Sequence, residues 1–356
     1  MKLLIAVDKS RFSHIERFSS ELKKKGIECL VIDDLDIYDN SKFDKRILRW
    51  TKTPKKFSKI IDDFSPDLVF TERVSHFSSL IIKRNIPLVI FLRGDYWKEL
   101  KSERDVKNNF NNIRIENFVK QNIAEKCFKK STLILPICKY LEKIVNERYP
   151  EKTTSVLYQG IKDSEWFYEK GMKLKHPCVG LIQDANIWEK TKELSLLPNI
   201  LDRLPNVNFY WAGDGKYSSR ILQLLEGYEN FHWLGNLAYP EEVRQFLSEI
   251  DIYGLLTGID MSPHTLLEAG LMKKPVLATN VGGVSESCIN NKTCFLIEKN
   301  DPQGWIDKIS VLLEDKEKMT RMGEEGFEYI NENFLWSKIA GSFIEILESK
   351  KNMKFN

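Results

Sequence analysis

The stretch from Asp251 to Glu286 reads DIYGLLTGIDMSPHTLLEAGLMKKPVLATNVGGVSE, and it predicts a strand, a loop, a helix, a second strand and a glycine loop. Ile252 to Leu256 is a short apolar run, which is typical of a buried strand. Ser262 suits a helix N-cap and the proline after it suits the first helical position, so we expect the helix to start there. The second strand is expected to begin at Pro275.

The expected helix start is a candidate anion site. A helix that opens at the end of a strand directs its free N–H groups and its dipole at whatever binds above it. We expect Ser262, His264 and Thr265 to lie at this point, with Asp260 just before it and Glu268 about one and a half turns into the helix. Two carboxylates beside an anion site indicate one ligand with hydroxyl and phosphate groups. The alternative is an ordinary strand–helix–strand unit whose acids are solvated.

The same stretch resembles the donor-binding segment of retaining glycosyltransferases of family 4, the group of glycogen synthase and phosphatidylinositol mannosyltransferases, which have the GT-B fold. The family pattern is an acid, seven residues, Glu-Ala, a Lys-Pro-Val strand and a Gly-Gly-x-x-Glu loop. These parts appear here as Asp260, Glu268-Ala269, Lys274-Pro275-Val276 and Gly282 to Glu286. The first acid is usually Glu, so Asp260 is a departure that shortens the reach by one methylene. The resemblance runs from about residue 60 to the end and is strongest between 177 and 298.

The resemblance implies an α/β architecture with two Rossmann-like, doubly wound domains facing across a cleft. A chain of 356 residues is also long for a single core and suits two domains. We expect an acceptor-side domain over residues 1–164, a linker over 165–176 and a nucleotide-sugar donor domain over 177–332. The last segment, 333–356, is expected to form a helix that packs back on the first domain.

By the same resemblance, the chain transfers a sugar from a UDP- or GDP-linked donor. Glu268 would take the ribose hydroxyls, Asp260 would contact the transferred sugar, and Lys190 would neutralise the leaving diphosphate together with the helix start. Arg93 stands in a loop near the donor sugar where the family has His. Further donor contacts are implied at Gly180, Gly213, Gly215 and Tyr239.

No cofactor and no metal are expected, because Lys190 and backbone donors would do the work of a divalent ion. Leu181 and Thr191 stand where the family has Arg and Gly. These departures keep two alternatives open. One is a nucleotide-sugar-binding protein with impaired catalysis, and the other is a phosphorylase or sugar-phosphate synthase on the same fold.

The charge distribution suggests where the acceptor binds. Residues 1–160 hold 32 Lys and Arg against 22 Asp and Glu, a net charge of +10, whereas the remainder has a net charge of −7. The densest basic run, residues 42–59, is interleaved with aromatic and aliphatic side chains, which is typical of a surface that meets an anionic membrane or acceptor. No nucleic-acid motif accompanies it. The candidate acceptor or membrane residues are Lys45, Arg46, Arg49, Trp50, Lys55 and Lys56.

The six cysteines are scattered without any C-x-x-C pair, which favours reduced thiols and argues against a zinc site. No apolar run approaches the length needed to span a bilayer, and the N-terminal MKLLIAVDKS suits a buried strand better than a signal peptide. We therefore expect a cytoplasmic protein that binds peripherally to the membrane and uses a lipid-linked or glycan acceptor. Asp34-Leu35-Asp36 superficially resembles a metal-binding D-x-D motif, but it follows a strand in an acidic turn and is interpreted as solvated.

Overall fold

The computed structural model describes residues 1–9, 12–38, 46–98 and 111–350, and it divides the chain into two compact units. Unit 1 comprises Met1–Gly160 and Trp336–Asn356, and unit 2 comprises Ile161–Leu335. The segment 165–176, expected as a linker, belongs to unit 2. Arg244 holds it there, with an ion pair of 2.6 Å to Glu169 and a hydrogen bond to the carbonyl oxygen of Glu165.

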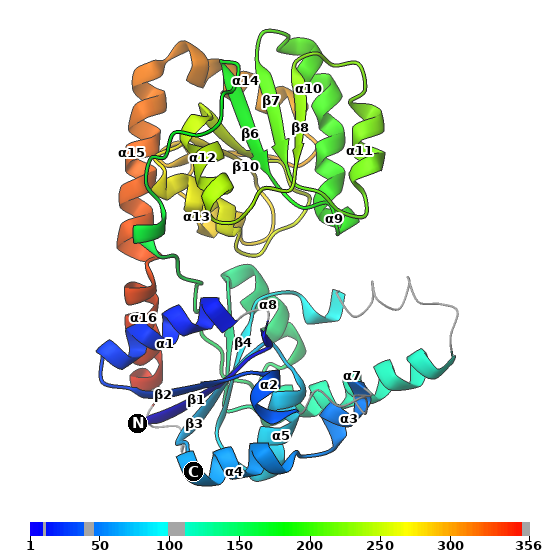
Figure 1. The fold of residues 1–356 in the computed structure, drawn as a ribbon, viewed down its shortest axis with the longest axis vertical. Coiled ribbons are helices and arrows are strands. Elements are labelled where there is room, and N and C mark those ends of the chain that lie inside the picture. Colours follow the sequence, from blue (N-terminus) through cyan, green and yellow to red (C-terminus); the bar gives the residue numbers. More distant parts are fainter. Residues whose placement is uncertain (10–11, 39–45, 99–110, 351–356) are drawn as a thin grey trace. The chain divides into compact units, whose positions relative to one another are not determined.

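The described part of unit 1 is built on a parallel five-stranded sheet of order β2-β1-β3-β4-β5 (Figure 1). Its strands are β1 (Lys2–Ala6), β2 (Glu28–Ile32), β3 (Leu68–Glu72), β4 (Leu88–Leu92) and β5 (Leu133–Pro136). Its helices are α1 (Phe12–Lys24), α2 (Asp34–Ile37), α3 (Arg46–Thr51), α4 (Lys55–Phe64), α5 (His76–Arg84), α7 (Asn111–Lys130), α8 (Lys139–Arg148) and α16 (Trp336–Ser349).

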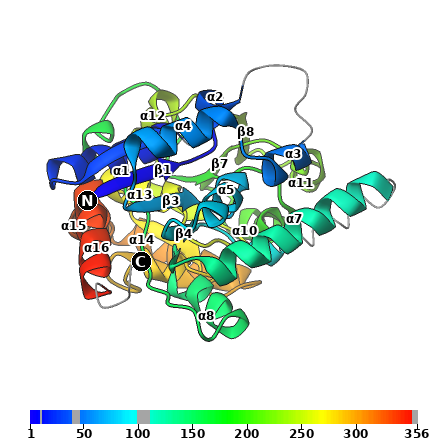
Figure 2. The ribbon, with the colours of Figure 1, turned by 90° about the horizontal axis from the view of Figure 1, so that it is seen from below.

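The last helix completes the core of unit 1, although it lies almost two hundred residues after β5 in the sequence. Helices α1 and α16 lie side by side (Figures 1 and 2). The Phe343 ring lies 5.4 Å from that of Phe18 and 5.7 Å from that of Phe70, measured between centroids. The helix is therefore held by aromatic packing, as the apolar spacing of its residues predicts.

The described part of unit 2 is built on a parallel six-stranded sheet of order β11-β10-β9-β6-β7-β8. Its strands are β6 (Cys178–Ile182), β7 (Asn208–Ala212), β8 (Phe231–Gly235), β9 (Ile252–Leu255), β10 (Val276–Thr279) and β11 (Cys294–Ile297). Its helices are α9 (Trp188–Thr191), α10 (Leu197–Arg203), α11 (Ser218–Leu224), α12 (Glu241–Glu249), α13 (His264–Leu271), α14 (Pro302–Glu314) and α15 (Lys316–Asn333), with short 3-10 turns η2 (Asp163–Glu165), η3 (Lys192–Leu196) and η4 (Val284–Glu286).

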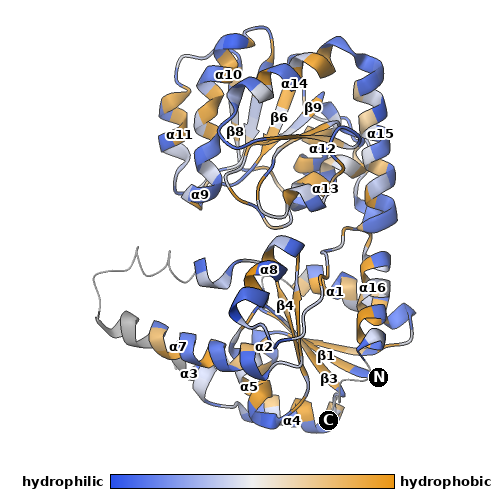
Figure 3. Ribbon diagram, turned by 180° about the vertical axis from the view of Figure 1, so that it is seen from behind, coloured by the Kyte–Doolittle hydropathy of each residue, from blue (hydrophilic) through white to orange (hydrophobic). Residues whose placement is uncertain are grey.

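Five strands of this sheet are mostly buried on both faces, whereas the edge strand β8 is only partly buried. Gly180 in β6 faces α12, because a Cβ atom there would lie 2.6–2.8 Å from the side chains of Ile250 and Phe246. Its neighbour Leu181 points to the opposite face, in a core cluster shared with Trp305 of α14. In Figure 3 the central strands are mostly coloured as hydrophobic, and the helices around them carry both hydrophobic and hydrophilic residues. Continuous apolar strands are the expected result in a parallel sheet.

The structure confirms the predicted α/β architecture of two Rossmann-like domains with parallel sheets, and the last helix belongs to the first of them. Among the residues that the structure describes, no helix combines the length and the apolar composition that crossing a bilayer requires.

One expectation about the cysteines is wrong. Cys288 and Cys294 form a disulfide, although all six cysteines were expected to be reduced. The residues between them form a tight turn, in which the N–H of Asn291 donates to the carbonyl of Cys294, and this turn brings the two sulfur atoms together. The other four cysteines are free and buried.

We predict that Phe343→Ala destabilises unit 1 by about 3–5 kcal/mol, because the ring is fully buried and its removal leaves a cavity. Phe118→Ala is the matched control, since the Phe118 side chain is 61% exposed. Thermal unfolding would show a melting temperature several degrees lower for Phe343→Ala only. Equal behaviour of the two variants would contradict the assigned role of the last helix.

Candidate functional site

The candidate site lies at the carboxyl edge of the sheet of unit 2. Parallel strands end at the same edge, so the loops that follow β6, β9 and β10 meet there, and this edge is where doubly wound sheets bind ligands. Lys190 comes from α9, after β6, and Asp260 comes from the loop after β9. The Lys190 Nζ atom lies 2.7 Å from Asp260 Oδ2, and both side chains are partly accessible to solvent.

Asp260 also decides where the next helix begins. Its Oδ1 atom accepts the N–H groups of Met261 and Ser262, at 2.8 and 3.3 Å. These bonds hold the two residues in a turn, so that α13 starts at His264 with Pro263 as its N-cap. The predicted N-cap at Ser262 is therefore wrong. An aspartate is short enough to accept from its own backbone neighbours, as in an Asx turn, and this accounts for Asp in place of Glu.

Two glycines allow these loops to approach one another closely. A Cβ atom on Gly258 would lie 2.1 Å from the carbonyl oxygen of Glu189, and the Gly258 N–H donates to the carbonyl of Lys190 at 3.0 Å. A Cβ atom on Gly282 would lie 2.1 Å from the carbonyl oxygen of Asp260. Side chains at either position would force the loops apart, so the glycines fix the placement of the Lys190–Asp260 pair.

Glu268 is the fifth residue of α13 and is almost completely buried. Burial raises the pKa of its carboxyl to about 8; a hydrogen bond with the Tyr239 hydroxyl acts in the opposite direction, and the negative charge of Glu165 raises the pKa further. His264 lies one turn before Glu268, with 3.9 Å between its Nδ1 atom and Glu268 Oε1. The predicted ribose-binding carboxylate is thus largely protonated near neutral pH in this structure.

The other predicted donor residues differ in their placement. Thr265 lies in the first turn of α13, where its Oγ1 atom accepts a hydrogen bond of 2.5 Å from Tyr253. Gly213 and Gly215 follow β7 at the same sheet edge. The residue between them, Asp214, accepts the N–H of Ala185 with its backbone carbonyl oxygen. Gly180 lies inside β6 under α12, so packing alone accounts for a glycine there.

Residues 188–329 match the model of the family Glycosyl transferases group 1. This segment forms a glycosyl transferases group 1 domain. Three similar proteins add to this comparison, two of them over nearly the whole chain. The chain is 31% identical over 147 residues to N-acetyl-alpha-D-glucosaminyl L-malate synthase of Bacillus anthracis, an alignment that covers 40% of this chain and 39% of that relative.

The second relative, an uncharacterized glycosyltransferase of Methanocaldococcus jannaschii, is 25% identical over 94% of this chain and 93% of its own length. Among solved structures, Anabaena HepE in complex with UDP superposes with a TM-score of 0.68 at 16% identity, covering 98% of this chain and all of that one. The likeness in structure covers both units, and it supports the GT-B fold class for the whole chain.

Outside the group 1 domain, Arg93 follows β4 in unit 1. Its guanidinium forms an ion pair with Glu72, whose side chain is completely buried, and donates to Gln159 Oε1 at 2.7 Å. The carboxylate that Arg93 binds in this structure therefore belongs to the protein itself. Its predicted part in catalysis is not tested by this geometry.

The predicted acceptor residues lie on or before two helices of unit 1. Lys45 lies outside the described residues, and Arg46 begins α3 with a side chain that is not described. Arg49 lies 3.2 Å from Asp34 and stacks on Tyr38, with 4.7 Å to the ring centroid. Asp34 also lies 3.0 Å from His76 Nε2, so it is not simply solvated as expected.

The remaining residues of this predicted surface divide into exposed and buried ones. Lys55 and Lys56 are exposed on α4, and Trp50 is half-buried. Phe57, counted among the apolar residues of the basic run, is completely buried. Of the described residues in this run, the lysines rather than the aromatic rings therefore form the accessible surface.

Sequence reasoning missed three residues that shape the site. Gln183 lies after β6 and donates to the carbonyl of Lys190 at 3.1 Å. Tyr253 supports Thr265 from within the sheet, and Glu165 raises the pKa of Glu268 from the segment that was expected to be a linker. Glu165 lies 103 residues before Glu268, and Tyr253 lies 12 residues before Thr265. Gln183 could have been predicted as a site residue, because it is a polar residue directly after a strand. No feature of the sequence around Glu165 indicates that it lies near Glu268.

We predict that the stability difference between Glu268→Gln and the native protein depends on pH. The folded protein holds the Glu268 proton up to about pH 8, whereas the unfolded chain releases it near its ordinary pKa of 4.5. Folding therefore takes up a proton between these values, and the stability of the native protein falls as pH rises through them. The melting temperature of Glu268→Gln relative to the native protein should rise from pH 5 to pH 8. Glu241→Gln, at an exposed position, should show a constant difference; a constant difference for Glu268→Gln would disprove its buried, protonated state.

Proposed function

We propose that the chain is a retaining, metal-independent glycosyltransferase of family 4 that uses a UDP- or GDP-linked sugar. The observation that carries this proposal is the Lys190–Asp260 pair, held at the carboxyl edge directly before the start of α13, with Glu268 one turn further along. A cation, a helix N-terminus and a carboxyl group in this order suit a diphosphate with its attached ribose. The structure of HepE, solved in complex with UDP, supports a nucleotide donor.

In this mechanism the protein acts by stabilising charge on the leaving group. When the bond between sugar and diphosphate breaks, negative charge grows on the diphosphate. The Lys190 ammonium and the first N–H groups of α13 would stabilise that charge, and groups fixed in advance by the fold do so without reorganisation. Without a donor, the Asp260 carboxylate is the partner of the Lys190 ammonium. Donor binding would replace this carboxylate with a phosphate as the partner of Lys190.

Glu268 and Asp260 would orient the two ends of the donor. The Glu268 carboxyl can form two hydrogen bonds to the ribose diol, with Tyr239 already bonded to it from the loop after β8. Asp260 would contact the transferred sugar. Retention would follow from attack on the face that the diphosphate leaves, with the leaving phosphate helping to deprotonate the acceptor, so no protein nucleophile takes part.

We predict that Lys190→Ala lowers turnover more than it weakens donor binding, because its charge matters most in the transition state. Purified protein is incubated with UDP- and GDP-sugars, and donor hydrolysis and nucleotide affinity are measured separately. Lys292→Ala, an exposed lysine of the same unit, is the matched control. A change in KM alone would make Lys190 a ground-state anchor. Nucleotide binding with no turnover of any donor would favour the catalytically impaired binding protein instead.

For the acceptor, we propose an anionic molecule, either lipid-linked or a glycan, used at the cytoplasmic face of a membrane. Exposed lysines at positions 52, 55, 56 and 59 form a basic surface on and before α4. Each such residue contributes about 1 kcal/mol to binding near an anionic bilayer, which in sum permits reversible attachment. Because Phe57 is buried, attraction by charge rather than insertion of aromatic rings would hold the protein there.

We predict that the protein sediments with anionic vesicles at low salt and is released at high salt, because a Debye length shortens as ions are added. Replacing the four lysines with Gln should abolish sedimentation. Replacement of Lys170, Lys292, Lys316 and Lys338 with Gln, all exposed elsewhere, should leave it intact. Equal recovery in the supernatant with neutral and anionic lipid would exclude membrane attachment and leave a soluble acidic acceptor.

A further inference from the structure

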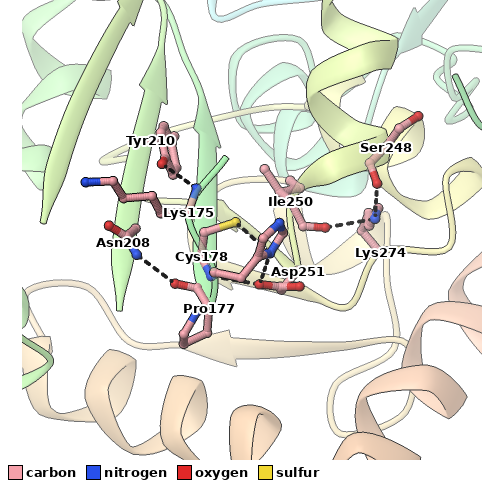
Figure 4. A network of polar contacts seen from close by, with 10 residues as sticks. Lys175, Pro177, Cys178, Asn208, Tyr210, Ser248, Ile250, Asp251 and Lys274 are labelled. Carbon is pink, nitrogen blue, oxygen red and sulfur yellow. Dashed lines mark hydrogen bonds and ion pairs between the residues drawn. The ribbon is translucent and has the colours of Figure 1, made fainter. Parts of the chain in front are cut away.

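A second polar cluster lies at the amino-terminal edge of the sheet of unit 2, where β6 and β9 begin. Cys178 is the first residue of β6, and Asp251 immediately precedes β9. The two strands pair in parallel with Val179 opposite Ile252, so the register places Cys178 beside Asp251. Asp251 Oδ2 accepts the N–H of Cys178 at 2.7 Å (Figure 4). The sheet itself therefore fixes a thiol next to a carboxylate.

His176 adds a nitrogen atom to this pair. Its Nδ1 atom lies 2.8 Å from Asp251 Oδ2 and 3.7 Å from Cys178 Sγ. One ligand atom from each of the three residues lies within 4.8 Å of the others. Sulfur, nitrogen and oxygen thus converge on one point, from residues on two adjacent strands and the segment that leads into the first of them.

These distances can be compared with the edges of a tetrahedral zinc site. Zn–S bonds of about 2.3 Å and Zn–N bonds of about 2.0 Å give a sulfur–nitrogen edge of about 3.6 Å, close to the observed separation. The nitrogen–oxygen edge would be about 3.3 Å, so an ion would have to separate the His176 and Asp251 atoms by about half an ångström. The His176 side chain is 46% exposed, and it has room to make this adjustment.

We propose that His176, Cys178 and Asp251 bind one zinc ion, with a water molecule as the fourth ligand. Thiolate, imidazole and carboxylate are the ligands that Zn²⁺ takes in proteins, and the soft sulfur disfavours magnesium and calcium. Binding replaces the thiol proton with the ion and releases that proton to solvent. The cluster lies at the opposite edge of the sheet from Lys190, so the ion would lie away from the proposed donor site, and through His176 it would tie the segment before β6 to the sheet.

A second group of candidate metal ligands is present in the described residues, but it has a different charged neighbour. Asp8, Asp34 and His76 in unit 1 also lie within 4.8 Å of one another. There the Arg49 guanidinium lies 3.2 Å from Asp34 and would repel a cation.

One cation near the zinc cluster is Lys274, whose ammonium donates to two backbone carbonyls. It lies 2.8 Å from the oxygen atoms of Ser248 and of Ile250 (Figure 4). Its ammonium is thus bonded to these carbonyls, whereas the Arg49 guanidinium is paired directly with the candidate ligand Asp34.

The experiment titrates Zn²⁺ into the full-length protein, freed of metal and handled without oxygen and without added reductant so that the Cys288–Cys294 disulfide stays intact, against a colorimetric chelator. We expect one equivalent to bind, and Co²⁺ in its place to give the near-ultraviolet absorption of a cobalt–thiolate bond. Loss of partners that only orient metal ligands costs 10–100-fold in affinity, so His176→Ala and Cys178→Ala should each weaken binding by about 100-fold or more. Cys127→Ala, which removes an equally buried thiol in unit 1, should bind like the native protein.

Thermal unfolding provides a second measurement that does not depend on activity. Zn²⁺ should raise the melting temperature of the native protein and of Cys127→Ala by several degrees, and leave that of His176→Ala unchanged. The His176 side chain is about half exposed, whereas Cys178 is completely buried, so the His176 variant should fold even where Cys178→Ala does not. Absence of stoichiometric binding at micromolar zinc, or equal affinity in His176→Ala and the native protein, would overturn the proposal.

Discussion

The arrangement of the candidate site depends on the hydrogen bonds and the ion pair of one residue, Asp260. One carboxylate oxygen holds Met261 and Ser262 in a turn, and the other binds Lys190 from the loop after β6. The backbone carbonyl of Asp260 accepts the N–H of Gly283 from the loop after β10 at 2.9 Å. Three loops that are separated in sequence are thus joined at one residue. The parallel sheet brings their ends to one edge, and Asp260 fixes their distances within it.

This arrangement places both charges of the pair before any ligand arrives. A lysine with no partner beside a helix N-terminus would combine two sources of positive potential, whereas Asp260 offsets one of them. The protein therefore avoids the electrostatic cost of an uncompensated cation, and a diphosphate would take over part of the role of the carboxylate. Leu181, at the position where the family resemblance implied an arginine, is buried under α14 and brings no further charge. In the described part of this edge, Lys190 thus carries much of the proposed compensation.

Local sequence patterns predicted the architecture well, because the spacing of apolar residues decides whether a segment forms a buried strand or an amphipathic helix. Continuous apolar runs marked the buried parallel strands, and the apolar spacing of residues 336–347 predicted the amphipathic helix α16. The order of Asp260 and Glu268 around a helix start also predicted that two acids would lie at one sheet edge. The predicted start of α13 was wrong because a Ser-Pro pair is typical of a helix start, whereas the hydrogen bonds from Asp260 hold Met261 and Ser262 in a turn before it. The pKa of Glu268 could not be predicted either, since it reflects burial among residues far apart in sequence.

Long-range pairing also explains why charge counts along the sequence are poor guides to recognition. The net charge of unit 1 suggested a basic binding surface, yet two of its arginines are neutralised internally. Arg93 is bound to the buried Glu72, and Arg49 to Asp34. Glu72 is the last residue of β3 and its side chain is completely buried, so its pairing with Arg93 removes a charge from the accessible surface. A charge that is paired in this way contributes little to the attraction of a ligand. The exposed lysines at positions 52, 55, 56 and 59 therefore describe the accessible basic surface better than the net charge does.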